Sequence, residues 1–197
     1  MIIGLTGKSC SGKDTVASLL DERFVVIDED ALGHRALENN VDRIREAFGD
    51  DVISNGAVDR KKLGSVVFSS PEKLAELNSI SHPWMVAETL RMCREIEDEG
   101  KIAVINAAIL EEMGFVKYCS EIIFVLSPYE KRLQRALRRD GVSEEGFRKR
   151  SESQKEIGAT LFSCGKKVVT IINDKEKEEL SRQVASYCAS MKKVRVQ

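Results

Sequence analysis

Five short apolar runs stand out along a chain in which polar and charged residues are otherwise well mixed. The runs are mostly β-branched and lack the apolar–polar alternation of a strand with one solvated face. They are typical of strands buried on both faces of a parallel sheet. The segments between them have helical spacing, and alternating strands and helices predict an α/β fold. The strands are predicted at residues 2–6, 24–28, 102–106, 122–127 and 168–172.

The distances between these runs predict where the sheet carries extra structure. One helix, over residues 13–23, joins the first two strands, whereas residues 29–101 separate the second strand from the third. An insertion at that edge of an open α/β sheet lies where ligands bind. We therefore predict a helical substrate lobe over about residues 30–100, inside a single domain that spans residues 1–197.

Helix start signals are visible within this insertion. Asp59 is placed to cap a helix over Arg60–Val67. Ser70 before Pro71 is a second strong start. A further long helix is expected after Pro83, because proline is best tolerated in the first turn of a helix.

A second insertion follows the fourth strand. Residues 131–157 are rich in lysine and arginine, break at Asp140 and Gly141, and restart as a helix at Ser143. A solvated helical hairpin explains this composition as well as a functional role does. Beside a phosphate-binding loop, however, a basic hairpin is better interpreted as a lid that closes over a polyphosphate.

The overall composition disfavours several classes of protein. A formal net charge of −1 gives no reason to expect nucleic acid or an anionic membrane as a partner. The five cysteines form no CxxC pair, which disfavours a zinc site or a disulfide framework. No apolar run approaches the roughly 20 residues of a membrane span. We expect a soluble, cytoplasmic protein that is a monomer or a weak homo-oligomer.

The loop after the first strand carries the clearest chemical motif. Gly7, Gly12 and Lys13 fit the GxxxxGK pattern, with a buried strand before the loop and a helix after it. The glycines allow close backbone approach, successive N–H groups point at a phosphate, and the lysine reaches the β- and γ-phosphates. The predicted nucleotide-binding residues are Gly7, Lys8, Ser9, Cys10, Ser11, Gly12, Lys13, Asp14 and Thr15.

The residue after the lysine departs from the usual pattern, which has serine or threonine there to hold Mg²⁺. Here it is Asp14, followed by Thr15. A carboxylate is a suitable hard-oxygen ligand, so we predict that Asp14 holds Mg²⁺ directly or through a water. The alternative is a site that has lost catalysis and only binds nucleotide.

Two absences from the sequence narrow the type of nucleotide-binding protein. The guanine-reading NKxD motif of GTPases is missing, and the third strand ends in Asn106 and Ala107 instead of the Asp-Glu of a hydrolytic ATPase. A small-molecule kinase needs instead a substrate lobe, an arginine-bearing lid and a base near the end of the second strand. The chain has candidates for all three.

Asp28 and Asp30 are candidate bases at the end of the second strand. Two residues apart in an extended segment, they would share a face and point toward the phosphate-transfer centre. A carboxylate there could accept the proton of an attacking hydroxyl. We favour Asp30 as the base, although it could also cap a helix that starts at Ala31.

Segments spread from the first strand to Gln154 carry motifs in a fixed order. They are Ile3–Lys13, Ile27–His34, Asn55–Leu63, Leu77–Pro83, Ala108–Glu111, Arg139–Gly141 and Arg150–Gln154. Together they resemble the dephospho-CoA kinase family, whose members use ATP to phosphorylate the ribose 3′-hydroxyl of dephospho-CoA. The resemblance implies a three-layer P-loop NTPase fold with a five-stranded parallel sheet, and it implies ATP with Mg²⁺ as the phosphoryl donor.

The resemblance also implies roles for single residues. Asp30 matches the catalytic base, Lys13 holds ATP, and Arg139 matches the lid arginine that neutralises the transferring phosphate. Asn173 is implied near the adenine. Without the family, His34 and His82 would be interpreted as capping, packing or turn residues. The residues implied to contact dephospho-CoA are Asp30, His34, Arg60 and His82.

Several positions depart from the family pattern. Lys8 and Cys10 replace loop glycines. Lysine is tolerable beside phosphates. Cys10 is small, and it requires only that its backbone φ be negative. Asp14 replaces serine, and Asn106 with Ala107 replaces the family's Asp-Val-Pro, so that Asn106 takes the place of the aspartate. Since Asn106 keeps the shape of aspartate without its charge, it partly balances the charge that Asp14 adds, and we hypothesise that the two changes are coupled.

Two other functions fit part of this pattern. Another small-molecule kinase, for a nucleotide or a nucleoside, explains the loop, the lobe and the lid, but not the ordered motifs together. A non-catalytic nucleotide-binding paralogue explains Asp14 and Asn106 most directly. A pure binder, however, has little need for a base such as Asp30.

Overall fold

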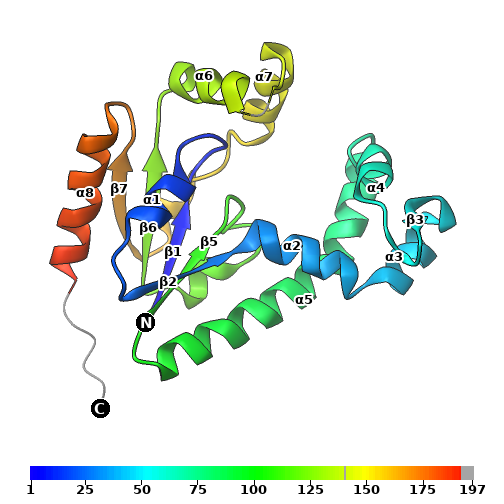
Figure 1. Cartoon of the computed structure of the whole chain (residues 1–197), viewed down its shortest axis with the longest axis horizontal. Helices are drawn as coiled ribbons and strands as arrows, with labels where there is room; N and C mark the ends of the chain where they lie inside the picture. The colour runs from blue at the N-terminus through cyan, green and yellow to red at the C-terminus, as the bar shows by residue number, and fades with distance from the viewer. Residues whose placement is uncertain (140, 192–197) are drawn as a thin grey trace. The chain divides into compact units, whose positions relative to one another are not determined.

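The computed structural model describes residues 1–139 and 141–191 (Figure 1). Asp140, at the predicted break of the lid, and residues 192–197 lie outside the described residues. The chain divides into two compact units: residues 1–27 together with the chain from Met92 onward form the first, and residues 28–91 form the second. The substrate lobe was expected over a wider range than this second unit, and its role stays a prediction.

A parallel five-stranded sheet organises the first unit (Figure 1). Its strand order is β2-β5-β1-β6-β7, so the first strand of the chain lies in the centre. Each predicted strand is present, and the ends differ from the prediction by at most one residue. The strands are β1 (Ile2–Thr6), β2 (Phe24–Asp28), β5 (Ile102–Asn106), β6 (Glu121–Leu126) and β7 (Lys167–Ile172).

Helices and loops cover both faces of this sheet, which gives the predicted three layers. On one face, α1 (Lys13–Leu19) and α8 (Lys177–Ser190) pack together, and their Val16 and Val184 join Ile3 in the core (Figure 1). The other face of β1 is closed by the segment after β5, which includes the 3-10 helix η2 (Phe115–Tyr118). A Cβ on Gly4 would lie 2.6 Å from Leu110 Cδ2, so glycine lets this side chain approach the strand closely.

Helix α1 is shorter than the predicted range of residues 13–23. It ends at Leu19, because Leu20 takes extended backbone angles of φ −66° and ψ 147°. A turn into β2 follows, in which Arg23 Nη2 donates to Asp21 Oδ2 at 2.7 Å and to the Cys188 carbonyl at 2.6 Å. These polar contacts, which the sequence pattern does not reveal, compete with continuation of the helix.

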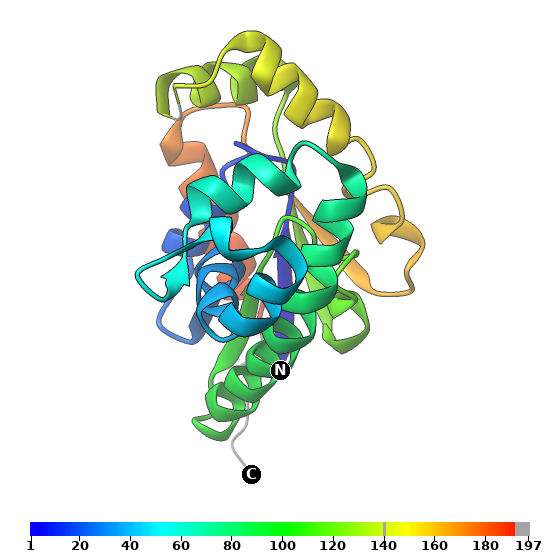
Figure 2. The same cartoon turned by 90° about the vertical axis from the view of Figure 1, so that its right-hand side faces the viewer.

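The remaining helices of the first unit follow β6. Helices α6 (Tyr129–Arg139) and α7 (Glu144–Ser153) fall mostly within the range predicted as a lid and stand next to each other at the top of Figure 2. Ser143 starts α7 as predicted, since its Oγ accepts the Gly146 N–H at 3.1 Å. A 3-10 helix, η3 (Leu161–Ser163), precedes β7. Closure of this pair over a nucleotide stays a prediction.

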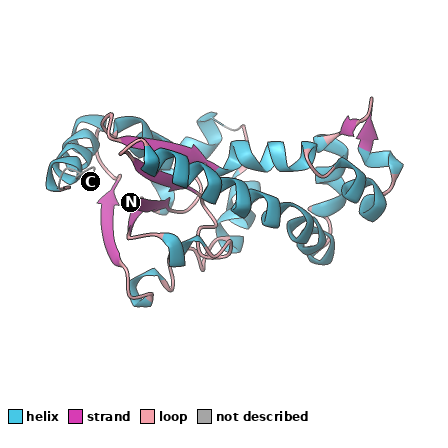
Figure 3. Cartoon of the chain, turned by 90° about the horizontal axis from the view of Figure 1, so that it is seen from below, coloured by secondary structure: helices cyan, strands magenta, loops and turns pink. Residues whose placement is uncertain are grey.

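The second unit is mainly helical and has a core of its own, formed by Ile44, Val52, Leu63, Val67 and Ile80. Two short antiparallel strands form a ribbon beside its helices (Figure 3). The last helix of the unit continues into the first unit. The elements are α2 (Glu29–Glu38), α3 (Val41–Phe48), η1 (Asp50–Val52), β3 (Ile53–Ser54), β4 (Ala57–Val58), α4 (Arg60–Val67) and α5 (Pro71–Asp98).

Two helix starts in this unit confirm the prediction. Asp59 Oδ1 accepts the N–H groups of Lys61 and Lys62, both at 3.1 Å, and caps α4. Ser70 Oγ accepts the Lys73 N–H at 3.3 Å, and α5 begins at the next residue, Pro71.

The predicted helix start after Pro83 is wrong, because α5 runs through this proline without interruption. An interior proline costs about 3 kcal/mol, since it removes one backbone hydrogen bond and crowds the preceding turn. Ile80 and Met85 are both buried, at 6% and 7% exposure, on either side of it. Burial on both flanks offsets the local cost and keeps one helix. Among the described residues, no helix is long and apolar enough to cross a membrane.

Candidate functional site

The P-loop lies between β1 and α1, where the predicted motif requires it. Gly7 and Gly12 have φ values of 153° and 98°, which only glycine adopts readily. At Gly12 a Cβ would lie 2.1 Å from Asn173 Nδ2, so a side chain is excluded by contact as well as by backbone angle. Lys13, the first residue of α1, follows directly.

The expected negative φ of Cys10 is wrong. Cys10 has φ 59°, in the left-handed region, where a non-glycine residue is strained by roughly 1–2 kcal/mol. Its carbonyl accepts a hydrogen bond from Arg135 Nη1 at 3.1 Å, and its Sγ lies 3.8 Å from Arg139 Nη2. Contacts from α6 therefore hold the loop in this shape. The family pattern has a glycine at this position, and a glycine would adopt the same φ without strain.

Two arginines of α6 fasten the loop by its own backbone. Arg135 Nη1 donates to the Ser11 carbonyl at 3.3 Å and to Ser127 Oγ at 2.9 Å, in addition to Cys10. Arg132 Nη1 donates to the Ser9 carbonyl at 3.4 Å. Burial lowers the pKa of both guanidinium groups, which start from so high a value that they stay charged. Sequence reasoning missed these roles, although the spacing of three residues places both arginines on one helix face.

Asn173 contacts the loop from the end of β7. It is 7% exposed, and its Nδ2 donates to the Ser11 carbonyl at 2.8 Å. Its Oδ1 and its carbonyl both accept from Arg135 Nη2 at 3.1 Å. The described contacts are therefore structural, and the predicted place of Asn173 near the adenine stays a prediction.

The segment after α7 reaches the other side of the loop. Gln154 Oε1 accepts the Ser9 N–H at 2.7 Å. Lys8 Nζ donates to the Lys155 carbonyl at 3.1 Å, so the lysine that replaces a glycine binds the chain itself. The loop is thus held from α6, from β7 and from the segment that follows α7.

A cavity of about 300 Å³ opens beside this loop. Arg139 is among the residues that line it, and its side chain is 64% exposed, which leaves the guanidinium accessible to an anion. The lining residues are Cys10, Gly12, Thr15, Arg135, Arg138, Arg139 and Asn173. A glycine-rich loop and three arginines on one cavity form a site suited to phosphate groups.

Asp14 and Asn106, the two departures that were hypothesised to be coupled, are in direct contact. Asn106 Nδ2 donates to Asp14 Oδ1 at 3.1 Å. Asn106 is 8% exposed, and its buried Oδ1 has no hydrogen-bond partner within residues 1–139 and 141–191. Asp14 Oδ2 lies 4.0 Å from Arg139 Nη1.

In the second unit, the start of α2 differs from the expectation. Asp28 is the cap: its Oδ1 accepts the N–H groups of Asp30 at 2.9 Å and Ala31 at 3.4 Å, and the helix begins at Glu29. Asp30 is therefore not a cap for a helix from Ala31, and it does not share an extended face with Asp28. Its side chain is exposed on the first helical turn, in the α-helical conformation.

Glu29, between these aspartates, is a buried carboxyl that sequence reasoning missed. It is 3% exposed, and its Oε1 lies 2.6 Å from Thr89 Oγ1, which also lies 2.8 Å from the Met85 carbonyl. Its Oε2 has no partner in the described part of the chain. Burial raises the pKa of Glu29 to about 7, the Thr89 hydroxyl opposes this, and the charges of Asp28 and Asp30 add to it.

The other residues predicted to contact the acceptor lie on three helices of the second unit. His34 is exposed on α2, and Arg60 is exposed at the start of α4. His82 is half-buried within α5. Their joint action on one acceptor stays a prediction.

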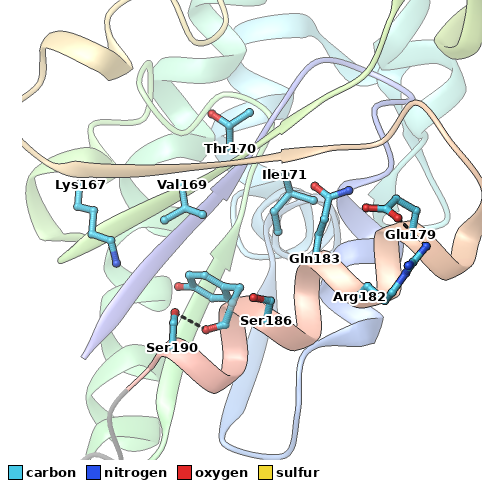
Figure 4. Close-up of a pocket in the computed structure, with 10 residues that line it drawn as sticks. Lys167, Val169, Thr170, Ile171, Glu179, Arg182, Gln183, Ser186 and Ser190 are labelled. Atoms are coloured by element: carbon cyan, nitrogen blue, oxygen red, sulfur yellow. Dashed lines mark hydrogen bonds and ion pairs between the residues drawn. The ribbon is translucent and has the colours of Figure 1, made fainter.

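A larger cavity, of about 510 Å³, lies between β7 and α8 (Figure 4). Gln183 of α8 accepts the N–H of Ile172 at 3.0 Å and donates to its carbonyl at 2.9 Å. The charges at this cavity are partly paired within the helix, as with Arg182 and Glu179 at 2.7 Å. It has neither a glycine-rich loop nor converging arginines, so the smaller cavity is the better candidate for phosphate binding.

Comparisons with known proteins agree with the geometry. The family model described as dephospho-CoA kinase matches residues 1–182. The dephospho-CoA kinase of Fusobacterium nucleatum is 34% identical over an alignment that covers 97% of this chain and 98% of that protein.

Solved structures extend the likeness to the fold. The crystal structure of a Thermus thermophilus protein matches with a TM-score of 0.79 and 29% identity over 98% of both chains. The dephospho-CoA kinase of Campylobacter jejuni matches with a TM-score of 0.65 and 23% identity over 95% of both chains, which supports the fold alone. The chain belongs to the dephospho-CoA kinase family, a family of ATP-dependent phosphotransferases with a P-loop fold.

Proposed function

We propose that the protein transfers the γ-phosphoryl group of ATP to the ribose 3′-hydroxyl of dephospho-CoA. The observation that carries the proposal is the P-loop, whose carbonyls are bonded to α6 and to Asn173 while its cavity presents Arg138 and Arg139. Membership of the family supports the choice of donor and acceptor.

The first unit supplies the groups that hold the phosphates. In this proposal the backbone N–H groups of residues 7–12 and Lys13 contact the β- and γ-phosphates, and Arg139 balances the charge that shifts during transfer. The guanidinium of Arg139 is exposed, so an anion can reach it.

The second unit supplies the groups for the acceptor. The 3′-hydroxyl oxygen forms a bond to the γ-phosphorus, the bond between that phosphorus and ADP breaks, and the hydroxyl proton passes to the Asp30 carboxylate. Asp30 suits this role because it is exposed and its helix start is fixed by the cap at Asp28. His34, Arg60 and His82 are proposed to bind dephospho-CoA.

The residues present also suit Mg²⁺, which kinases of this kind use with ATP. Asp14 carries an exposed carboxylate, and the buried Asn106 Oδ1 beside it lacks a hydrogen-bond partner among the described residues. We propose that Asp14 holds the ion, directly or through a water. When bound, Mg²⁺ neutralises charge on the β- and γ-phosphates. Asp14 would hold the ion with its carboxylate, whose Oδ1 accepts a hydrogen bond from Asn106 Nδ2 at 3.1 Å.

We infer further that the protein works in the cytoplasm, as a monomer or weak homo-oligomer. Its five cysteines are all free, and three of them are buried, which suits a reducing compartment.

A mass-spectrometric end-point assay tests the proposed function. The protein is given ATP, Mg²⁺ and dephospho-CoA, with adenosine and AMP as competing acceptors. We expect the mass of one phosphoryl group on dephospho-CoA alone, and none with the Lys13→Ala variant. Transfer to another acceptor would replace dephospho-CoA as substrate, and ATP binding without any transfer would favour a non-catalytic nucleotide-binding protein.

A further inference from the structure

The contact between Asp14 and Asn106 joins two positions that both concern Mg²⁺ in P-loop proteins. Such proteins commonly hold the ion with a serine or threonine hydroxyl directly after the P-loop lysine, and with an aspartate near the end of a neighbouring strand. In this chain the carboxylate stands after the lysine, at Asp14, and the strand β5 ends in the neutral Asn106. The carboxylate thus follows the lysine and the neutral side chain ends the strand, which reverses the usual arrangement.

The fold forces these positions together. Asn106 pairs with Leu5 in the parallel register of β5 and β1, and the P-loop leaves β1 two residues after Leu5. The loop returns to the same edge of the sheet at Lys13, the start of α1. The hydrogen bond of 3.1 Å between Asn106 Nδ2 and Asp14 Oδ1 is the outcome. Whatever occupies one position therefore sets the electrostatics of the other.

Only one carboxylate suits this pair. Two carboxylates at this distance would repel each other, and one of them would bind a proton or move away. An amide at position 106 instead donates to Asp14 and restrains the orientation of its carboxylate. Hydrogen bonds of this kind orient metal-binding carboxylates and tune their affinity.

We propose that Asn106 is a positioning residue for Asp14, and that the pair is an exchanged form of the usual magnesium ligand set. The single negative charge has moved from the strand end to the helix start, and the neutral partner has moved the other way. The proposal rests only on the part of the proposed function in which Mg²⁺ and nucleotide bind at the P-loop. It does not depend on the acceptor.

A double-mutant cycle tests the exchange without any assay of catalysis. The four proteins are the wild type, Asp14→Ser, Asn106→Asp and the double variant. Isothermal titration calorimetry measures the Kd of ADP with Mg²⁺ and with EDTA, and their ratio is the magnesium-dependent gain in affinity. We expect Asp14→Ser to reduce this gain about 10- to 100-fold. Losses of metal affinity of this size are typical when a residue in the outer shell of a metal site is replaced.

The sign of the second substitution is the decisive result. Asn106→Asp should weaken MgADP binding when Asp14 is present, because two carboxylates then meet. In the Asp14→Ser background the same change should strengthen binding, because it restores one carboxylate. Asn106→Ala should lower the magnesium-dependent gain while the Kd in EDTA stays unchanged, as expected for a residue that acts through Asp14.

Controls separate a metal role from a loss of folding. Glu178→Ser removes an exposed carboxylate from the first turn of α8 in the same unit and should leave the gain unchanged. Thermal unfolding without nucleotide shows whether each variant is folded. Folded variants with additive effects, or a double variant no better than Asp14→Ser, would overturn the proposal. A failed acceptor assay with an intact cycle would reject only the proposed substrate.

Discussion

Polar groups are arranged differently in the two units. Around the P-loop of the first unit, Arg132, Arg135 and Asn173 are bonded to the chain's own carbonyls before any ligand binds. In the second unit, Asp30 and His34 stand exposed on one helix, with their side chains open to solvent. The nucleotide side is thus organised by the fold. Asp30 and His34, which are proposed to contact the acceptor, are left exposed by the fold.

The largest expected effect concerns the exposed Asp30 of the second unit. Asp30→Asn keeps the size of the side chain and removes the proton acceptor. We expect kcat for dephospho-CoA to fall by about 10²- to 10⁴-fold, the usual contribution of a general base. Steady-state kinetics measure this effect, and calorimetry should show an unchanged Kd for ADP.

The matched control for Asp30 is Asp42→Asn, which changes an exposed aspartate in the first turn of α3 in the same unit. It should leave kcat unaltered. A nearly normal kcat in Asp30→Asn would mean that another group accepts the proton, and the proposed role would have to be withdrawn.

Two arginines of α6 test how the fold organises the P-loop of the first unit. Arg135→Ala removes hydrogen bonds from the partly buried carbonyls of Cys10, Ser11 and Asn173, and we expect the free energy of unfolding to fall by about 3 kcal/mol. Arg139→Ala removes an exposed side chain and should change that free energy by less than about 0.5 kcal/mol, while kcat falls. Urea unfolding and kinetics separate these outcomes. Equal loss of stability in both variants would contradict the inference that Arg135 stabilises the loop whereas Arg139 is available to the ligand.

A last effect, which is graded with pH and reaches at most the size expected for Arg135→Ala, comes from the buried carboxyl of the second unit. The pKa of Glu29 is raised from 4.5 to about 7 by burial, so the folded protein binds a proton there that the unfolded chain has released. Stability should therefore fall as the pH rises from about 4.5 to about 7, by no more than about 3 kcal/mol.

Glu29→Gln removes the titration and keeps a group able to donate to Thr89. The variant should lose this part of the pH slope in urea unfolding between pH 5 and about 7. A protonated Glu29 can donate to Thr89 Oγ1, which leaves the Thr89 hydroxyl proton for the Met85 carbonyl. An unchanged slope in the variant would show that Glu29 is ionised in the folded protein.

The sequence predicted most of what depends on chain-local patterns. The strands were located to within one residue because runs such as Ile102–Asn106 are apolar on both faces. The P-loop and the caps at Asp59 and Ser143 follow from short motifs with a direct physical cause. The family was also visible from the order of its motifs, and the comparisons confirm it.

What the sequence could not predict depends on contacts between distant segments. Cys10 takes its positive φ in a loop held by Arg135, which lies far along the chain. Pro83 stays within α5 because buried residues flank it, and local propensity argues for the opposite. Glu29 could not be recognised as buried, because its neighbours in sequence are exposed aspartates and its partner is on another helix.

The bond between Gln183 and Ile172 has a consequence for the behaviour of the protein in concentrated solution. β7 is an edge strand, and the exposed backbone of such strands can pair with another chain and begin aggregation. The Gln183 amide occupies both the N–H and the carbonyl of Ile172, as a neighbouring strand would. One side chain of α8 thus shields the apolar end of the edge strand from strand addition, and it does so without lengthening the sheet.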